Sequence, residues 1–187
     1  TAGLSADGGL SVQGGLSVHD NVFVRRHLKV EQGITVKYLK VTGGITVQGG
    51  ISHVDSVIVH EQIAVNEGMS VDGGLSVQGG LSVHDNAFVK KHLKAEQGIT
   101  TKYIKATGGI SAAGGLSVQG GLSVHDNVFV RRHLKAEQGI TAKYIKATAG
   151  LSADGGLSVQ GGLSAHDNVF VRRHLKVEQG VTAKYVK

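Results

Sequence analysis

Aliphatic residues recur along this chain with a period of six. In each unit a large aliphatic residue is followed two positions later by Val or Ala, as in Leu10-Ser11-Val12 and Leu16-Ser17-Val18. A helix requires an apolar spacing near 3.6 residues, and a long flat strand requires a spacing of 2. A period of six instead predicts a very short strand with two inward side chains, followed by a corner. Repeated over residues 1–187, it predicts an all-β fold, one continuous parallel β-solenoid of triangular section without a second domain.

The residue before each strand supports this interpretation. It is mostly Gly, as at Gly9 and Gly15, and otherwise often Asn or His, as at Asn21 and His27. These residue types are enriched at positive φ, so the pattern predicts a left-handed residue at each corner. The chain has no Pro, and Pro would remove hydrogen-bond donors from stacked strands.

Composition indicates a narrow core. Hydrophobic residues make up 40% of the chain, too many for a disordered segment, whereas the aromatic content of 4% is too low for an ordinary globular core. A triangular tube lined by one large and one small aliphatic residue per side explains both the high hydrophobic content and the low aromatic content. All four Phe fall at the outward, middle position of a strand: Phe23, Phe88, Phe129 and Phe170.

A longer repeat is superimposed on the hexads. The string His-Asp-Asn begins at His19, His84, His125 and His166, so its copies lie 65, 41 and 41 residues apart. Forty-one is seven hexads less one residue, and one residue is missing at the same place in every copy: Tyr38, Tyr103, Tyr144 and Tyr185. If three strands make one coil of about 18 residues, seven hexads do not complete a whole number of coils. Successive copies are therefore predicted to lie on different sides of the rod.

The hexads GGLSVQ-GGLSVH and the stretch LKVTGGITVQGG resemble the shaft repeats of phage tail fibres and related trimeric bacterial fibres. That resemblance implies a triple-stranded β-helix in which three identical chains intertwine. It also implies an extracellular location, or one on a virion or appendage, and a function as a structural fibre or spacer.

Two other hexapeptide families provide alternatives. The left-handed β-helix acyltransferases place their small residue before the large aliphatic one, whereas here Leu4 is followed by Ser5 and Ala6. The bactofilins are polymers of stacked β-helical monomers, and they suggest a single-chain solenoid that polymerises end to end. Val181 and Val186 continue the pattern almost to Lys187 without an obvious cap, and open strand edges favour pairing. Self-association as a homotrimer or as a filament is thus expected.

His53 is the most unusual inward position, because Val or Ala stands at nearly all the others. In an intertwined trimer, three copies of His53 would converge on the axis and form a metal or anion site. The alternative is a local slip that turns His53 outward and places Val54 inside.

Basic residues gather at the corners that follow the Phe strands. The chain carries a net charge of +6, and these corners bring paired cations close to an outward ring. Such groups bind an anionic glycan or a cell-envelope polymer, and an adhesin repeat is therefore a further alternative. Ordinary solvated ion pairs between neighbouring strands are the competing explanation. The candidate surface residues are Phe23, Arg25, Arg26, Phe129, Arg131, Arg132, Phe170, Arg172 and Arg173.

No feature of the sequence predicts an enzyme. The His19-Asp20-Asn21 corner and its copies combine ordinary turn residues on a convex surface, which lacks the pocket that catalysis requires. Without Cys the chain has no thiolate ligands, and no cofactor is expected. No apolar stretch reaches 18 residues, so membrane insertion is not expected, and neither is sequence-specific nucleic-acid binding.

Overall fold

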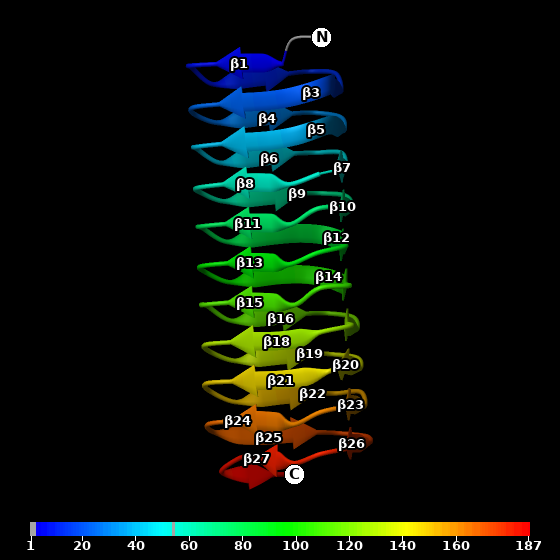
Figure 1. The fold of residues 1–187 in the computed structure, drawn as a ribbon. Helices are drawn as coiled ribbons and strands as arrows, with labels where there is room; N and C mark the ends of the chain where they lie inside the picture. The colour runs from blue at the N-terminus through cyan, green and yellow to red at the C-terminus, as the bar shows by residue number, and fades with distance from the viewer. Residues whose placement is uncertain (1–2, 54) are drawn as a thin grey trace.

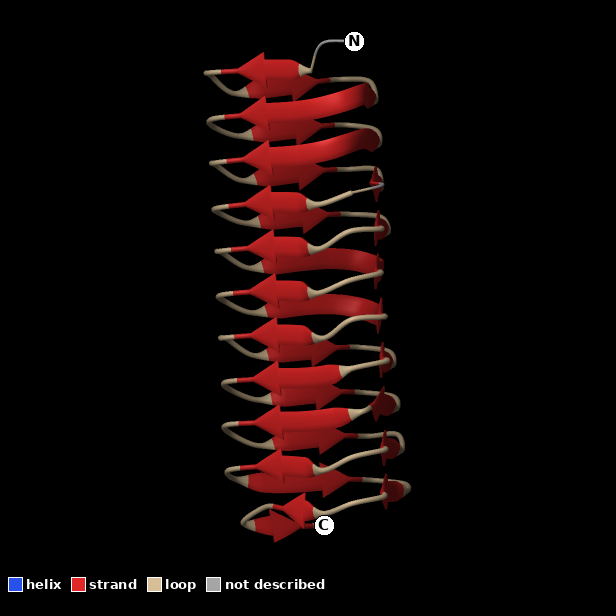
Figure 2. Ribbon diagram, in the orientation of Figure 1, coloured by secondary structure: helices blue, strands red, loops and turns tan. Residues whose placement is uncertain are grey.

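The computed structural model describes residues 3–53 and 55–187, and the strands among them wind into one straight rod. The 28 strands found among these residues belong to a single parallel sheet, and the first and the last strand lie at opposite ends of the rod (Figure 1). Strands alternate with short loops along the whole length (Figure 2). No helix occurs among the described residues, and hence none long and apolar enough to cross a membrane. The predicted all-β parallel solenoid is confirmed.

Three columns of strands form the sides of the rod. The first side contains β1 (Leu4–Ala6), the C-terminal parts of β3 (Leu16–Val24) and β5 (Ile34–Val41), β8 (Val57–Val59), β11 (Leu75–Val77), β13 (Leu93–Ala95), β15 (Ile110–Ala112), β18 (Asn127–Val130), β21 (Tyr144–Ala147), β24 (Leu163–Ala165) and β27 (Val181–Thr182).

The second side contains β2 (Leu10–Val12), β4 (Leu28–Val30), β6 (Ile45–Val47), β9 (Ile63–Val65), the N-terminal parts of β12 (Leu81–Val89) and β14 (Ile99–Ala106), β16 (Leu116–Val118), β19 (Leu134–Ala136), β22 (Leu151–Ala153), β25 (Asn168–Val171) and β28 (Tyr185–Val186). The third side contains the N-terminal parts of β3 and β5, then β7 (Ile51–His53), β10 (Met69–Val71), the C-terminal parts of β12 and β14, β17 (Leu122–Val124), β20 (Ile140–Ala142), β23 (Leu157–Val159) and β26 (Leu175–Val177).

Each strand pairs with the strand one coil further along the same chain. The ordinary step is 18 residues, as between Leu4 and Val22, and it shortens to 17 where a tyrosine corner intervenes, as between Val22 and Leu39. About ten such coils stack along the axis. The hexads thus become sides, and three hexads become one coil.

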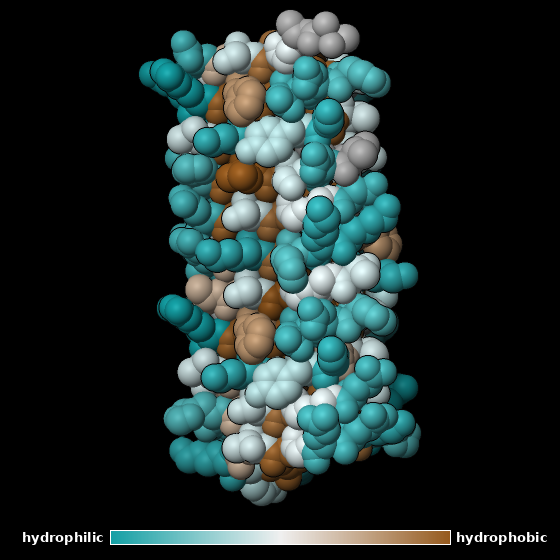
Figure 3. Space-filling model, in the orientation of Figure 1, coloured by the Kyte–Doolittle hydropathy of each residue, from teal (hydrophilic) through white to brown (hydrophobic). Residues whose placement is uncertain are grey.

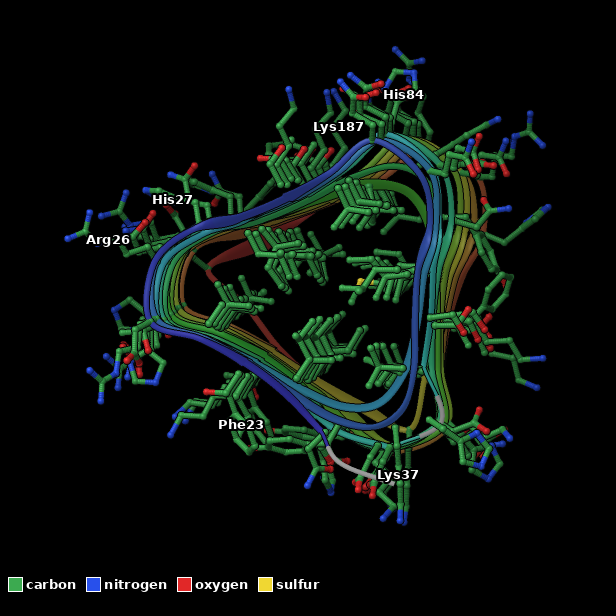
Figure 4. The ribbon with its side chains drawn as sticks, turned by 90° about the horizontal axis from the view of Figure 1, so that it is seen from above. Phe23, Arg26, His27, Lys37, His84 and Lys187 are labelled. Carbon is green, nitrogen blue, oxygen red and sulfur yellow. The ribbon has the colours of Figure 1, made fainter. Side chains whose placement is uncertain are left out.

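Aliphatic side chains fill the interior, as the sequence predicts. Leu93 and Ala95 of β13 are 0% and 1% exposed, and this pairing of a large and a small residue recurs on every side. The view along the axis shows the aliphatic side chains inside the triangle and Phe23, Arg26 and His84 outside it (Figure 4). The four Phe are 42–45% exposed, which confirms their outward position.

The predicted left-handed corners are wrong. No described residue, glycine or other, has a positive φ. Close approach of stacked corners favours glycine instead: a Cβ at Gly50, directly before β7, would lie 3.0 Å from the carbonyl oxygen of Gly68 on the next coil, and a Cβ at Gly49 would lie 2.5 Å from the carbonyl oxygen of Gln32 on the preceding coil. The Gly49 N–H donates to that same oxygen at 3.0 Å, so the axial hydrogen bond brings the backbones together.

Gly49→Ala and Gly14→Ala test this explanation, because both residues stand in a Gln-Gly-Gly corner. A Cβ at Gly14 meets nothing within 4 Å. We expect Gly49→Ala to lower the free energy of unfolding by about 1–3 kcal/mol through overpacking. Gly14→Ala should leave the free energy of unfolding unchanged, or should raise it by up to about 1 kcal/mol, because alanine lowers the conformational entropy of the unfolded chain. Denaturant titration measures both variants, and equal effects would contradict the explanation.

Candidate functional site

The four Phe are distributed over all three sides of the rod. Phe23 and Phe129 lie on the first side, Phe170 on the second and Phe88 on the third. Consecutive copies of the long repeat therefore rotate around the axis, as the sequence predicts. Figure 3 shows the consequence on one face, where hydrophobic residues surface at separate places among hydrophilic neighbours.

Three of the four exposed rings pack against a tyrosine of the next coil. The ring centroids are 5.8 Å apart for Phe23 and Tyr38, and the planes are tilted by 53°. The corresponding distances are 6.3 Å for Phe88 and Tyr103 and 6.1 Å for Phe129 and Tyr144. A tilted pair at this distance is a favourable aromatic contact. The tyrosine therefore holds one edge of the phenylalanine while the other side stays open to solvent.

The missing residue at the tyrosine corners explains this contact. The corner His19-Asp20-Asn21 has three residues, whereas the corner stacked on it, Lys37-Tyr38, has two, and the ladder shifts register between Val18 and Asn21. As a result Tyr38 pairs with Asn21 inside the ladder, diagonally beside Phe23. In ordinary corners that position is mostly Gly, which has no side chain to place there. The shortened corner thus provides a position for a large outward ring.

Open grooves lie beside three of the phenylalanines. The Phe23 groove is lined by Phe23, Arg25, Lys40, Thr42, Asp7 and Ser5, among others, and has a volume of ≈ 280 Å³. The Phe129 groove is lined by Phe129, Arg131, Lys146, Thr148, Lys94, Glu96 and Ser111, among others, and has a volume of ≈ 680 Å³. The Phe170 groove, with Phe170, Arg172, Asp154 and Lys187, has a volume of ≈ 420 Å³. Each groove combines a ring face, cations and hydroxyl groups, which suits binding.

The structure separates the two cations of each predicted basic corner. Arg25, Arg131 and Arg172 line grooves beside the rings, whereas Arg26, Arg132 and Arg173 do not line them. The second cation of each groove comes from the next coil, where Lys40 pairs in register with Phe23 and Lys146 with Phe129. Sequence reasoning missed these lysines. The signal is their spacing of 17 residues from the phenylalanine, which marks the next coil once a tyrosine corner is counted.

Carboxylates neutralise some of the cations. The Nε of Arg25 lies 3.4 Å from Oδ1 of Asp7, and the Nζ of Lys90 lies 3.0 Å from Oδ1 of Asp72, each on the preceding coil. Lys94, Lys135 and Lys176 also lie 3.6–3.8 Å from the glutamate two residues later. These side chains are well exposed, so each pair contributes little to stability, on the order of 0–1 kcal/mol. Local ion pairs therefore neutralise part of the positive charge that the sequence places at these corners.

The His-Asp-Asn corners have a structural role. The Asn21 N–H donates to Oδ1 of Asp20 at 2.9 Å, which is a local turn contact. In the second copy the buried Thr101 directs its hydroxyl toward the carbonyl oxygens of Asp85 and Tyr103, at 2.9 and 3.2 Å. Thr101 thus satisfies backbone acceptors at the register shift.

A histidine caps the next coil at the basic corners. Nδ1 of His27 accepts the N–H of Gly44 at 3.1 Å, and Nδ1 of His92 accepts that of Gly109 at 3.1 Å. His133 and Gly150 repeat the contact at 3.3 Å. Accepting at Nδ1 requires the neutral imidazole with its proton on Nε2. Histidine before a strand therefore serves this hydrogen bond, which is a second correction to the predicted left-handed corner.

The proposed ion site at His53 stays a prediction. The backbone of His53 ends β7 in register with Val36 and Val71, and its side chain and Val54 lie outside the described residues. Elsewhere in the described chain no three His, Asp or Glu side chains gather in a way that could hold a metal ion.

Comparisons with protein families, with curated proteins and with solved structures find no match to this chain. Function is therefore argued from the fold and the grooves.

Because His92 caps the amide of Gly109, we expect His92→Ala to expose that amide to solvent. Loss of the Nδ1 acceptor should free the Gly109 amide, so that its hydrogen exchange becomes faster by about tenfold, the equivalent of roughly 1–1.5 kcal/mol. Exchange measured by NMR would show this change. The Gly44 amide, capped by His27, is the control within the same molecule and should keep its rate. Equal exchange at Gly109 in both proteins would contradict the cap.

The contact between Phe129 and Tyr144 predicts energetic coupling. A double-mutant cycle of Phe129→Ala and Tyr144→Ala should give about 0.5–1.5 kcal/mol of interaction energy in the free energy of unfolding. Phe129→Ala with Tyr103→Ala is the matched control cycle, because Tyr103 packs on Phe88. That control should be additive, and coupling of the same size in both cycles would refute a direct contact.

Proposed function

We propose that this chain is a rigid β-helical rod that serves as a structural spacer or scaffold. One observation carries the proposal: the 28 strands of residues 3–53 and 55–187 form a single parallel sheet around one core, and these residues show no change of fold between the first coil and the last. A rod of this kind holds whatever lies at its two ends, or on its surface, at a set separation.

Stiffness follows from the way the coils stack. Backbone hydrogen bonds run along the axis from coil to coil, as from the Leu28 N–H to the Gly44 oxygen and from the Leu93 N–H to the Gly109 oxygen, both at 3.0 Å. Each coil also buries its aliphatic residues against its two neighbours. In such an array, opening one coil removes contacts from the next, so the stack unfolds cooperatively. Bending the rod would require the hydrogen bonds of these ladders to lengthen on one side of it.

The pairing within one chain supports a rod wound from a single chain. Every described ladder joins residues 17 or 18 positions apart, as with Leu75 and Leu93 or Leu93 and Ile110. In an intertwined homotrimer the neighbouring strand would belong to another chain. The homotrimeric fibre and the end-to-end filament are the alternative assemblies, and they differ from the single-chain rod in mass and length.

The setting that we propose is an extracellular or virion-associated appendage, without a catalytic role. Its support is the likeness of the hexads to fibre shafts, together with a surface of short polar strands and corners around a described interior that is aliphatic except for Thr101. A spacer requires these properties and no more.

Mass and particle length test the single-chain rod. At a strand spacing of ~4.8 Å, about ten coils give a rod ~50 Å long. Light scattering should return the mass of one chain, 19.4 kDa, and electron microscopy should show rods of that length. An intertwined trimer would have three times the mass and a length of ~150 Å, and a filament would show lengths in multiples of ~50 Å. Compact round particles would refute the rod in every form.

A further inference from the structure

The copies of the long repeat differ at one corner position on the coil before each phenylalanine. That position is Asp7, Asp72, Ala113 or Asp154, and the backbone stacks it directly against Arg25, Lys90, Arg131 or Arg172. Three copies thus place a carboxylate beside the basic residue, and in two of them the ion pair forms. At Arg131 the carboxylate is replaced by a methyl group.

Arg131 is consequently a cation without a carboxylate partner. Neither Arg131 nor Lys146 takes part in an ion pair with any residue in the ranges 3–53 and 55–187. Of the other charges along the Phe129 groove, Lys94 and Glu96 pair with one another at 3.8 Å. Two cations therefore remain to attract a ligand.

We propose that the Phe129 groove binds an acidic glycan through a sugar carboxylate. The related copies place a carboxylate against the same cation, so the geometry of the corner suits a carboxylate that comes from outside, and guanidinium groups favour this partner. The ring of Phe129 is 43% exposed and is held by Tyr144 at 6.1 Å. Its open side suits the apolar face of a sugar ring, and the hydroxyl groups of Ser111 and Thr148 along the groove suit sugar hydroxyls.

The rotation of the copies favours a short sugar segment over a nucleic acid. A protein binds a nucleic acid more tightly when a continuous track of its cations follows the phosphate backbone. Here the rings of Phe88, Phe129 and Phe170 lie on three different sides of the rod. A ligand contacts one groove at a time, and that groove offers one ring and two free cations.

The experiment uses the whole chain and trigalacturonate, a trimer of a carboxylated sugar, in isothermal titration calorimetry. Its neutral methyl ester is the ligand control, and a thymidine oligonucleotide of similar charge is the competitor. We expect one site per chain for trigalacturonate and no detectable binding of the ester. Ala113→Asp installs the carboxylate of the other copies, and affinity should fall about tenfold or more, as expected when a charge-assisted contact is lost.

Asp7→Ala is the reciprocal variant. It removes the partner of Arg25 in a groove that has the same phenylalanine, arginine, lysine and threonine as the Phe129 groove. We expect it to create a second site, so that the stoichiometry rises from one to two. Circular dichroism of both variants shows whether the fold is retained, and the gain of a site by Asp7→Ala does not depend on the folding of Ala113→Asp.

Four results would overturn the proposal. They are absent binding of trigalacturonate, equal binding of its ester, wild-type affinity in folded Ala113→Asp, and unchanged stoichiometry in Asp7→Ala. Tighter binding of the oligonucleotide that is lost in Ala113→Asp would assign the groove to nucleic acid instead. Since none of these outcomes changes the length or mass of the rod, this test is separate from that of the structural function.

Discussion

The structure depends on one packing constraint, the closure of a three-sided tube around one large and one small aliphatic residue per side. Leu93 with Ala95, and Ile110 with Ala112, show the arrangement at the middle of the rod, where all four are buried. The tube has no room for an aromatic ring, so every Phe is on the surface. Because only inward positions serve the core, the middle residue of each strand is free to vary. That freedom allows Ser, Lys, Thr and Phe to follow one another along a side.

Corners are a second constraint, and it acts between coils. Axial hydrogen bonds bring stacked corners so close that a Cβ at Gly114 or Gly155 would lie 2.5 Å from backbone atoms of the preceding coil. Ala149 stands at a corner position that is otherwise Gly43 or Gly108, so this corner accommodates a Cβ, and the close approach favours glycine without excluding alanine. Where a corner loses one residue, as at Tyr38, the strand continues around the bend and accommodates a large outward side chain. Corner length therefore decides where a tyrosine can stand beside a phenylalanine of the neighbouring coil.

The long repeat combines these two constraints into a surface pattern. Its length is not a whole number of coils, so consecutive copies present their rings and cations on different sides of the rod. Single substitutions then distinguish the copies: Asp7, one coil before Arg25, forms an ion pair with it, whereas Ala113 leaves Arg131 without a partner among the described residues. A structural rod can in this way carry binding positions without any change to its core, because corners and middle positions do not contribute to it.

The hexad pattern alone was sufficient to predict the strands, their parallel stacking, the aliphatic interior and the outward Phe23 and Phe129, because inward and outward positions follow from local spacing. It also predicted the rotation of the copies, which is arithmetic on that spacing. It did not predict that Gly49 is favoured by close approach, that His27 caps Gly44, or that Tyr38 and Lys40 lie beside Phe23. A single-chain coil and an intertwined trimer have the same inward pattern but different neighbours across the ladder. Contacts between coils were therefore decided only by the tertiary structure, through the pairing of each residue with the one 17 or 18 positions further along.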